Sequence, residues 1–134
     1  MQLMERLYEQ EVSIIVPTLC IAEFLVAYEP NEQNGIRAAI EQDFKLVVFD
    51  NLSAVQAARV YRINRDNGRH KEFKARNVGY PHQKLKVDHM IVGVAIANKV
   101  DMLYTNDSGL FNFAQTHIPV LMLPESGPRQ LVLN

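Results

Sequence analysis

Short runs of apolar, mostly β-branched residues alternate with longer amphipathic stretches along the chain. Such runs predict buried strands, here Ser13–Val16, Leu46–Phe49, Leu103–Thr105 and Val120–Met122. The stretches between them predict helices over residues 2–9, 18–28, 33–42, 54–64, 85–99 and 108–116. Strands that alternate with helices favour parallel β-α-β units with right-handed crossovers. The pattern therefore predicts an α/β fold, a three-layer α/β/α sandwich around a parallel sheet.

Local signals refine the bounds of these elements. Thr18 is the expected N-cap of the helix after the first strand, and either Asn51 or Ser53 is the expected N-cap of the helix after the second strand. The helix over residues 85–99 carries apolar residues around most of its circumference and should be deeply buried. Residues 68–81 are polar, basic and aperiodic, which predicts a mobile loop.

Length and composition place the chain among ordinary globular proteins. Its 134 residues, 48% hydrophobic and 22% charged, fit a single domain over residues 1–134. The longest apolar stretch, residues 12–28, is interrupted by Pro17, Thr18 and Glu23, so no membrane span is expected. The first residues resemble no signal peptide, and the single cysteine, Cys20, is expected to be a buried, inert thiol. A reducing cytoplasm is the expected location.

The net charge of −1 conceals a strong asymmetry. Residues 59–86 contain nine basic and two acidic residues, whereas the rest of the chain contains five basic and thirteen acidic ones. A solvated helix face would explain such a run. A cationic surface next to an acidic pocket would instead bind a polyanion such as RNA. The candidates for contacts to an RNA backbone are Arg62, Arg65, Arg69, Lys84 and Lys86.

Three carboxylates are candidates for a metal site. In an open parallel sheet ligands bind beyond the carboxyl ends of the strands. Asp107 follows the third predicted strand, Glu23 lies early in the helix after the first strand, and Asp88 lies in the first turns of an apolar helix. Each has an alternative explanation: Asp88 would favour a helix N-terminus, Asp107 would cap the next helix, and a buried Glu23 would need a partner. Together they form a hard-oxygen set that suits Mg²⁺ or Mn²⁺.

Three segments resemble acidic motifs of a known family. Residues 17–25 (PTLCIAEFL), 86–95 (KVDHMIVGVA) and 103–107 (LYTND) are similar to the second, third and fourth acidic motifs of the PIN-domain family. The closest resemblance is to the VapC-like toxin ribonucleases of prokaryotic toxin–antitoxin pairs. The similarity runs from about Leu3 to Leu123, with the motifs in the family's order.

This resemblance implies metal-dependent hydrolysis of RNA phosphodiester bonds. Glu23, Asp88 and Asp107 would be the catalytic residues and hold Mg²⁺ or Mn²⁺, while Thr105 and Asn106 would position the metal shell or the phosphate. An antitoxin protein and a second copy of the chain are the expected protein partners.

The sequence departs from the family pattern at its start. Family members open with the central strand of the sheet, which ends in the first aspartate of an acidic quartet, and here no aspartate precedes Asp43. The chain is therefore expected to be a PIN-like domain that lacks the usual first strand, either truncated or degenerate. Residues 130–134 or a neighbouring chain are candidates to fill the vacant place.

Two other interpretations remain open. The chain could be a non-catalytic PIN-like module that binds a protein partner. Alternatively, His82 and His89, which flank Asp88, could form a transition-metal site.

Overall fold

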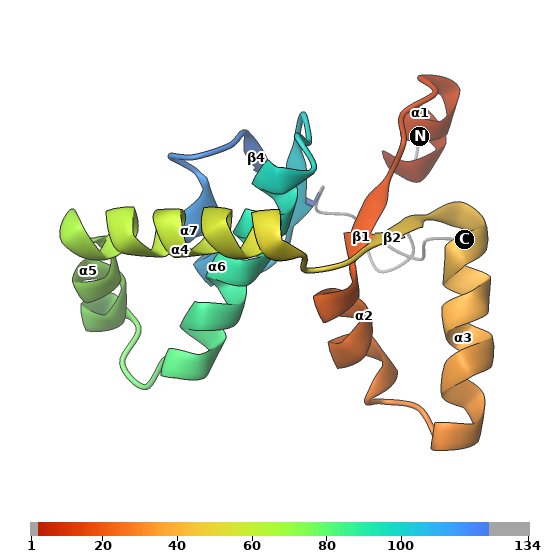
Figure 1. Ribbon diagram of the computed structural model, residues 1–134, viewed down its shortest axis with the longest axis horizontal. Helices are drawn as coiled ribbons and strands as arrows, with labels where there is room; N and C mark the ends of the chain where they lie inside the picture. The colour runs from red at the N-terminus through yellow and green to blue at the C-terminus, as the bar shows by residue number, and fades with distance from the viewer. Residues whose placement is uncertain (1–2, 124–134) are drawn as a thin grey trace. The chain divides into compact units, whose positions relative to one another are not determined.

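The computed structural model describes residues 3–123, which form seven helices and four short strands (Figure 1). They divide into two compact units, residues 3–47 with residue 123, and residues 48–122. Each unit contains one pair of parallel strands. The α/β class and the parallel pairing of the strands within each unit are thus confirmed.

The first unit contains three helices and two strands. In chain order these are α1 (Leu3–Glu9), β1 (Ile15–Pro17), α2 (Thr18–Leu25), α3 (Pro30–Asp43) and β2 (Lys45–Val47). β1 and β2 are parallel, with Ile15 opposite Lys45 and Pro17 opposite Val47. Helix α2 follows the carboxyl end of β1, whereas α3 leads into the amino end of β2 (Figure 1). Gln33 Nε2, on α3, donates a hydrogen bond to Leu25 O, on α2, at 3.0 Å.

Two helix starts in the first unit differ from the sequence prediction. Thr18 is the first residue of α2, and Pro17 is its N-cap, because β1 continues up to the helix. Helix α3 begins at Pro30, three residues before its predicted start. A proline suits the first helical position, where no N–H donor is needed.

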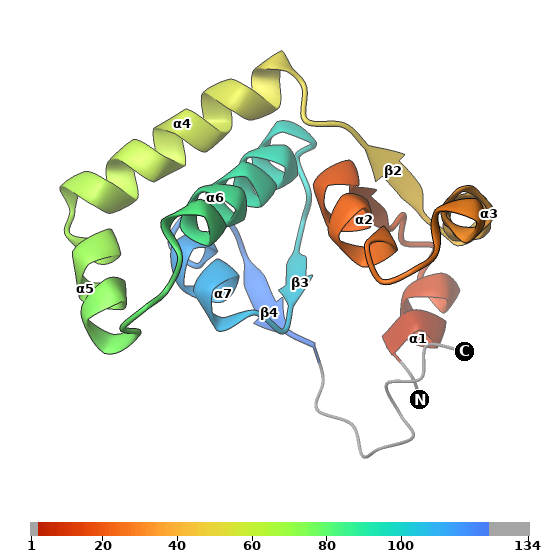
Figure 2. The same ribbon diagram turned by 90° about the horizontal axis from the view of Figure 1, so that it is seen from below.

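The second unit contains four helices and two strands. In chain order these are α4 (Asn51–Asp66), α5 (Arg69–Arg76), α6 (His82–Ala97), β3 (Leu103–Thr105), α7 (Ser108–Ala114) and β4 (Val120–Met122). β3 and β4 are parallel, with Leu103 opposite Val120. Figure 2 shows α4 beside α6, and the strands β3 and β4 next to α7.

The close packing of α4 on α6 depends on a glycine. A Cβ atom placed on Gly93 would lie 2.6 Å from Ser53 O and 2.7 Å from Ala57 Cβ. Only a residue without a side chain therefore allows this approach. As predicted, α6 is deeply buried, and its buried residues include Leu85, Ile91, Val92 and Val94.

Two sequence predictions in this unit were wrong. Residues 69–76 form helix α5, which lies within the predicted loop and buries His70 and Phe73, three residues apart on one helix face. Phe73 packs in an aromatic core cluster with Leu85 and Phe113. The N-cap of α4 is neither Asn51 nor Ser53 but Asp50, whose carboxylate accepts hydrogen bonds from Ser53 N at 2.9 Å and Ser53 Oγ at 2.8 Å.

Two further expectations concern the ends and the membrane. Residues 130–134, expected as a candidate to complete the sheet, lie outside the described residues. No helix within residues 3–123 has the length and apolar character needed to cross a membrane.

Candidate metal centre

Asp88 is held on the buried side of α6. It is the seventh residue of the helix and only 3% exposed. The Tyr80 hydroxyl, just before the helix, donates a hydrogen bond to Asp88 Oδ2. Tyr80 is itself fixed by an edge-on contact with Phe73, at 4.9 Å between ring centroids. One oxygen of the Asp88 carboxylate is therefore committed to a tyrosine, and the other, Oδ1, remains available.

Gly109 makes room for this hydrogen bond. A Cβ atom at this position would collide with the Tyr80 hydroxyl and lie 3.1 Å from Asp88 Oδ2. Gly109 is the second residue of α7. Because it has no side chain, the backbone of α7 can lie directly beside the Tyr80–Asp88 pair.

Asp107 is the N-cap of α7, two residues after β3. Its Oδ1 accepts hydrogen bonds from Gly109 N at 2.8 Å and Leu110 N at 3.1 Å, while its own N–H donates to Thr105 Oγ1 at 2.9 Å. The capping role considered for Asp107 is therefore observed. It uses one carboxylate oxygen and leaves Oδ2 available, as for Asp88.

The two available oxygens meet at one cation. Lys84 Nζ forms an ion pair with Asp107 Oδ2 and lies 3.6 Å from Asp88 Oδ1. The ammonium group also lies 5.4 Å from the centroid of the Tyr80 ring. Two carboxylates from different elements, each fixed through its other oxygen, thus converge on a single positive charge.

The pKa values of these groups reflect that arrangement. Burial raises the pKa of Asp88, and the hydrogen bond from Tyr80 and the charge of Lys84 oppose this only in part. Burial also acts on Asp107, but hydrogen bonds from Lys84 and Leu110 N outweigh it, and the pKa of Asp107 is lowered. Burial would lower the pKa of Lys84, yet its two carboxylate partners raise it above its ordinary value. Lys84 and Asp107 therefore stay charged at neutral pH.

Glu23 lies in the first unit, on α2, and its side chain is exposed. Glu23 therefore needs no partner to compensate for burial, and Ile21 is the only buried residue of α2. The neighbouring Cys20 is half-buried rather than fully buried. Burial and the charge of Glu23 raise the pKa of its thiol, which fits an inert cysteine.

The two residues predicted to position a metal shell or phosphate differ in exposure. Thr105 is buried, and its hydroxyl accepts the Asp107 N–H, so it orients Asp107. Asn106 is exposed.

The five basic residues predicted to contact RNA also occupy different environments. Arg62 and Arg65 are exposed and both pair with Asp66. Arg69 is partly buried and donates to Asn112 O at 3.3 Å. Lys84 is bound to the carboxylates, whereas Lys86 is exposed and forms no ion pair with any residue in the described part of the chain.

Three of the four histidines, His70, His89 and His117, belong to one hydrogen-bond network rather than to a site around Asp88. His89 Nδ1 lies 2.7 Å from Leu85 O, which can only accept, so His89 carries its proton on Nδ1 and accepts at Nε2. That nitrogen faces Asn64 Nδ2 at 3.0 Å and His70 Nε2 at 3.1 Å, which are therefore donors. Asn64 completes the network by donating to Phe113 O and accepting from His117 Nε2 at 2.9 Å. His82 is exposed at the start of α6, so His89 is not paired with it.

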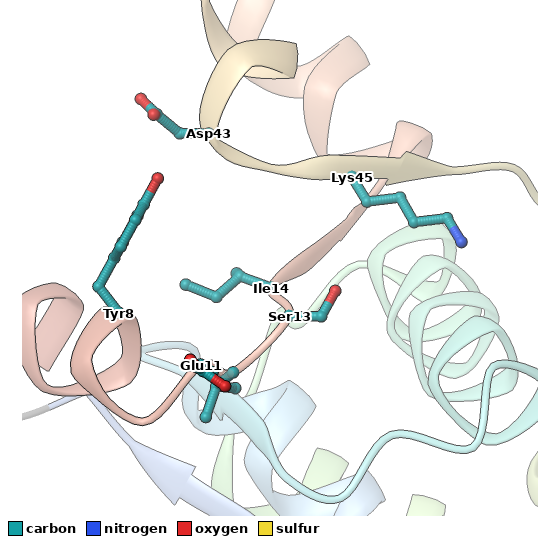
Figure 3. A pocket seen from close by; sticks show the side chains of 7 residues that line it. Tyr8, Glu11, Ser13, Ile14, Asp43 and Lys45 are labelled. Carbon is teal, nitrogen blue, oxygen red and sulfur yellow. The ribbon is translucent and has the colours of Figure 1, made fainter.

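A separate pocket of about 320 Å³ lies in the first unit. Figure 3 shows Tyr8 pointing toward Asp43, Glu11 on the opposite side, and the Lys45 side chain directed away from both. None of the predicted site residues lines it.

Sequence reasoning missed Tyr80 and Gly109 and assigned Lys84 only to RNA. The spacing of Lys84 and Asp88, four residues apart on one helix, was an available signal for an ion pair. The sequence near Tyr80 and Gly109 contains no signal for their roles, because these roles depend on the packing of α7 against Tyr80 and Asp88.

Within residues 3–123, no group of three or more His, Cys, Asp or Glu side chains is arranged to hold a metal ion. The pair Asp88 and Asp107 nevertheless fits Mg²⁺, which proteins commonly hold through one or two carboxylates together with water and substrate phosphate. No protein-family model matches this chain, and no curated protein matches it significantly.

Proposed function

We propose that this chain is a PIN-type ribonuclease that hydrolyses RNA with Mg²⁺ or Mn²⁺, and that it is the cytoplasmic toxin of a toxin–antitoxin pair. One observation carries the proposal: Asp88 Oδ1 and Asp107 Oδ2 converge on one cation position. The proposed reaction, RNA hydrolysis, and the proposed partner, an antitoxin, come from the resemblance of the three acidic segments to the PIN-domain family.

The residues have distinct tasks in this proposal. Asp88 and Asp107 hold the metal, and the family resemblance assigns Glu23 as a further carboxylate. Mg²⁺ bound there would supply Lewis-acid chemistry, polarising the phosphate and lowering the pKa of the attacking water. Tyr80 and Thr105 orient the two aspartates through their hydroxyl groups. The exposed Arg62, Arg65 and Lys86 would bind the RNA backbone without reading sequence.

We also propose that the two strand pairs belong to one parallel sheet of a three-layer α/β/α sandwich. Two-stranded sheets are marginally stable alone, so both pairs gain from further pairing. The resemblance implies a further, central strand of this sheet, which ends in another aspartate. Adding such a strand to the chain should tighten metal binding and speed cleavage, because it would supply another carboxylate to the metal.

Nuclease assays on single-stranded RNA test the activity. Cleavage should require Mg²⁺ or Mn²⁺ and stop in EDTA. Asp88→Asn should reduce it to background without unfolding the protein, because an amide keeps the shape and removes one negative oxygen. The matched control Asp101→Asn removes the same charge at an exposed position and should keep activity. Cleavage that persists in EDTA would exclude the metal mechanism.

A second candidate is a binding module without catalysis. It is favoured by Lys84, which already neutralises the two carboxylates. In that case an antitoxin or a second copy of the chain would bind equally well with and without divalent cations. A metal titration separates the two functions.

A further inference from the structure

Lys84 occupies the position that a shared metal ion would take. Among the described residues it is the only cation paired with either Asp88 or Asp107, and it contacts the oxygen of each that has no other protein donor. A cation bound to either oxygen, at the roughly 2.1 Å typical of Mg²⁺ or through a water molecule, would lie close to the ammonium group. Two cations at this distance repel each other, so they exclude each other from the site.

We propose that Lys84 is a built-in counter-ion of the Asp88–Asp107 pair, and that a divalent cation binds there only by displacing it. Lys84 then sets the metal affinity of the centre. This inference rests on the proposed metal site and assigns Lys84 to its regulation instead of to RNA binding.

The surroundings of the lysine allow this displacement. Its side chain is 42% exposed, so the flexible stem can carry the ammonium into solvent. Its closer pair, with Asp107, joins side chains that are 42% and 37% exposed, and ion pairs with such exposure contribute little free energy. A divalent ion can therefore replace the ammonium group at Asp107.

The carboxylates, in contrast, keep their positions when Lys84 leaves. Tyr80 holds Asp88 Oδ2, and the first N–H groups of α7 hold Asp107 Oδ1. Lys84 also lies over the Tyr80 ring, but it donates none of these hydrogen bonds to the carboxylates. The two ligand oxygens are therefore preorganised for a cation, and Lys84 protects them from mutual repulsion while no metal is bound.

Titration of the whole chain with Mn²⁺, followed by calorimetry and by the EPR signal of free Mn²⁺, tests the inference. Lys84→Gln should bind Mn²⁺ about tenfold more tightly than the unaltered chain, a coupling of ordinary size for two mutually exclusive cations. Lys86→Gln removes the same charge from the same helix, on an exposed position, and should change the affinity less than about twofold. Lys84→Arg keeps the charge and should stay close to the unaltered chain.

Thermal unfolding provides a second measurement that does not depend on activity. Without metal, Lys84→Gln should unfold at a lower temperature than Lys86→Gln, and Mn²⁺ should raise its midpoint more. Unchanged or weaker Mn²⁺ binding by Lys84→Gln would overturn the counter-ion role and leave the proposed function standing. Absence of Mn²⁺ binding in all four proteins would overturn both.

Discussion

Each unit of the chain joins two three-residue parallel strands through helices, yet the two units bury very different numbers of side chains. Within residues 3–47, only Ile21 and Val47 are buried. The second unit buries eleven hydrophobic side chains, from Ala57 to Ala114, and six polar or charged ones. The apolar pattern along the sequence is therefore enough to form strands and helices in both units, but a core forms only where several helices pack together.

The apolar residues of the first unit illustrate the difference. Helix α2 is one of the most apolar segments of the chain, but its Phe24, next to Glu23, is 48% exposed, and Val26, its C-cap residue, is 78% exposed. In the second unit, α5 is a polar helix, yet its Phe73 is buried and belongs to the core cluster. Burial thus follows the number of packing partners more closely than the hydrophobicity of the segment.

Replacement of a phenylalanine by alanine should change the free energy of unfolding by very different amounts in the two units, and this is the largest effect expected. Phe113→Ala removes a side chain with no exposed surface, and it should lower the free energy of unfolding by about 3–5 kcal/mol because a cavity remains. Phe24→Ala, on the half-exposed face of α2, should cost less than about 1 kcal/mol. Urea denaturation measures both values. Equal losses would show that Phe24 is also packed in a core.

Replacing either of two helical glycines by alanine should change the stability of the protein, but in opposite directions. Gly93→Ala forces a methyl group against Ser53 O and Ala57, and it should destabilise the protein by about 1–3 kcal/mol. A Cβ atom placed on Gly35, in α3, would meet no other atom within 4 Å, so Gly35→Ala should stabilise by about 0.5–1 kcal/mol. Thermal midpoints of the two variants test this. Stabilisation by Gly93→Ala would mean that α4 and α6 are not in close contact.

Acid should weaken the second unit selectively, because all four histidines lie there. Burial, together with the neighbouring His89, lowers the pKa of His70 to about 4, and burial lowers the pKa of His89 and His117 as well. Because the pKa of an unfolded histidine is about 6.5, protons bind preferentially to the unfolded state. The stabilisation is therefore fully present above pH 6.5 and is lost as the pH falls toward 4.

The expected loss between pH 7 and pH 5 is roughly 1 kcal/mol after allowing for solvent screening. Hydrogen exchange at both pH values should show faster opening of α4 and α6 than of α3. His70→Gln should reduce the pH dependence, whereas the control His82→Gln, at an exposed position, should leave it unchanged. An equal effect on α3 would contradict an origin in the histidine network.

Much of the fold and part of the candidate site could be predicted from the sequence. β3 and β4 have the predicted bounds, and the buried helix α6 was predicted from its continuous apolar surface. Glu23, Asp88 and Asp107 were predicted to lie at one end of the sheet, and in the structure Asp88 and Asp107 both pair with Lys84. These features follow from local periodicity and from the general geometry of parallel strands.

Other features could not be predicted because their partners are distant in sequence. Helix α5 was predicted as a loop because its eight residues contain six charged or imidazole side chains, and Phe73 alone did not produce a helical pattern. Asn64 bonds to Phe113 across 49 positions, and Lys84 pairs with Asp107 across 23. The sequence around Asn64 or Lys84 gives no indication of these distant partners.

The sequence by itself determined where the strands and most helices form, α5 excepted, since backbone periodicity, caps and prolines act over a few residues. It also determined which carboxylates lie near a strand end. Only the tertiary structure decided that Tyr80 fixes Asp88, that Gly109 allows it, and that Lys84 lies between the two aspartates. The physical reason is that a side chain acquires its role from the groups brought within a few ångströms of it, and packing between distant segments selects those groups.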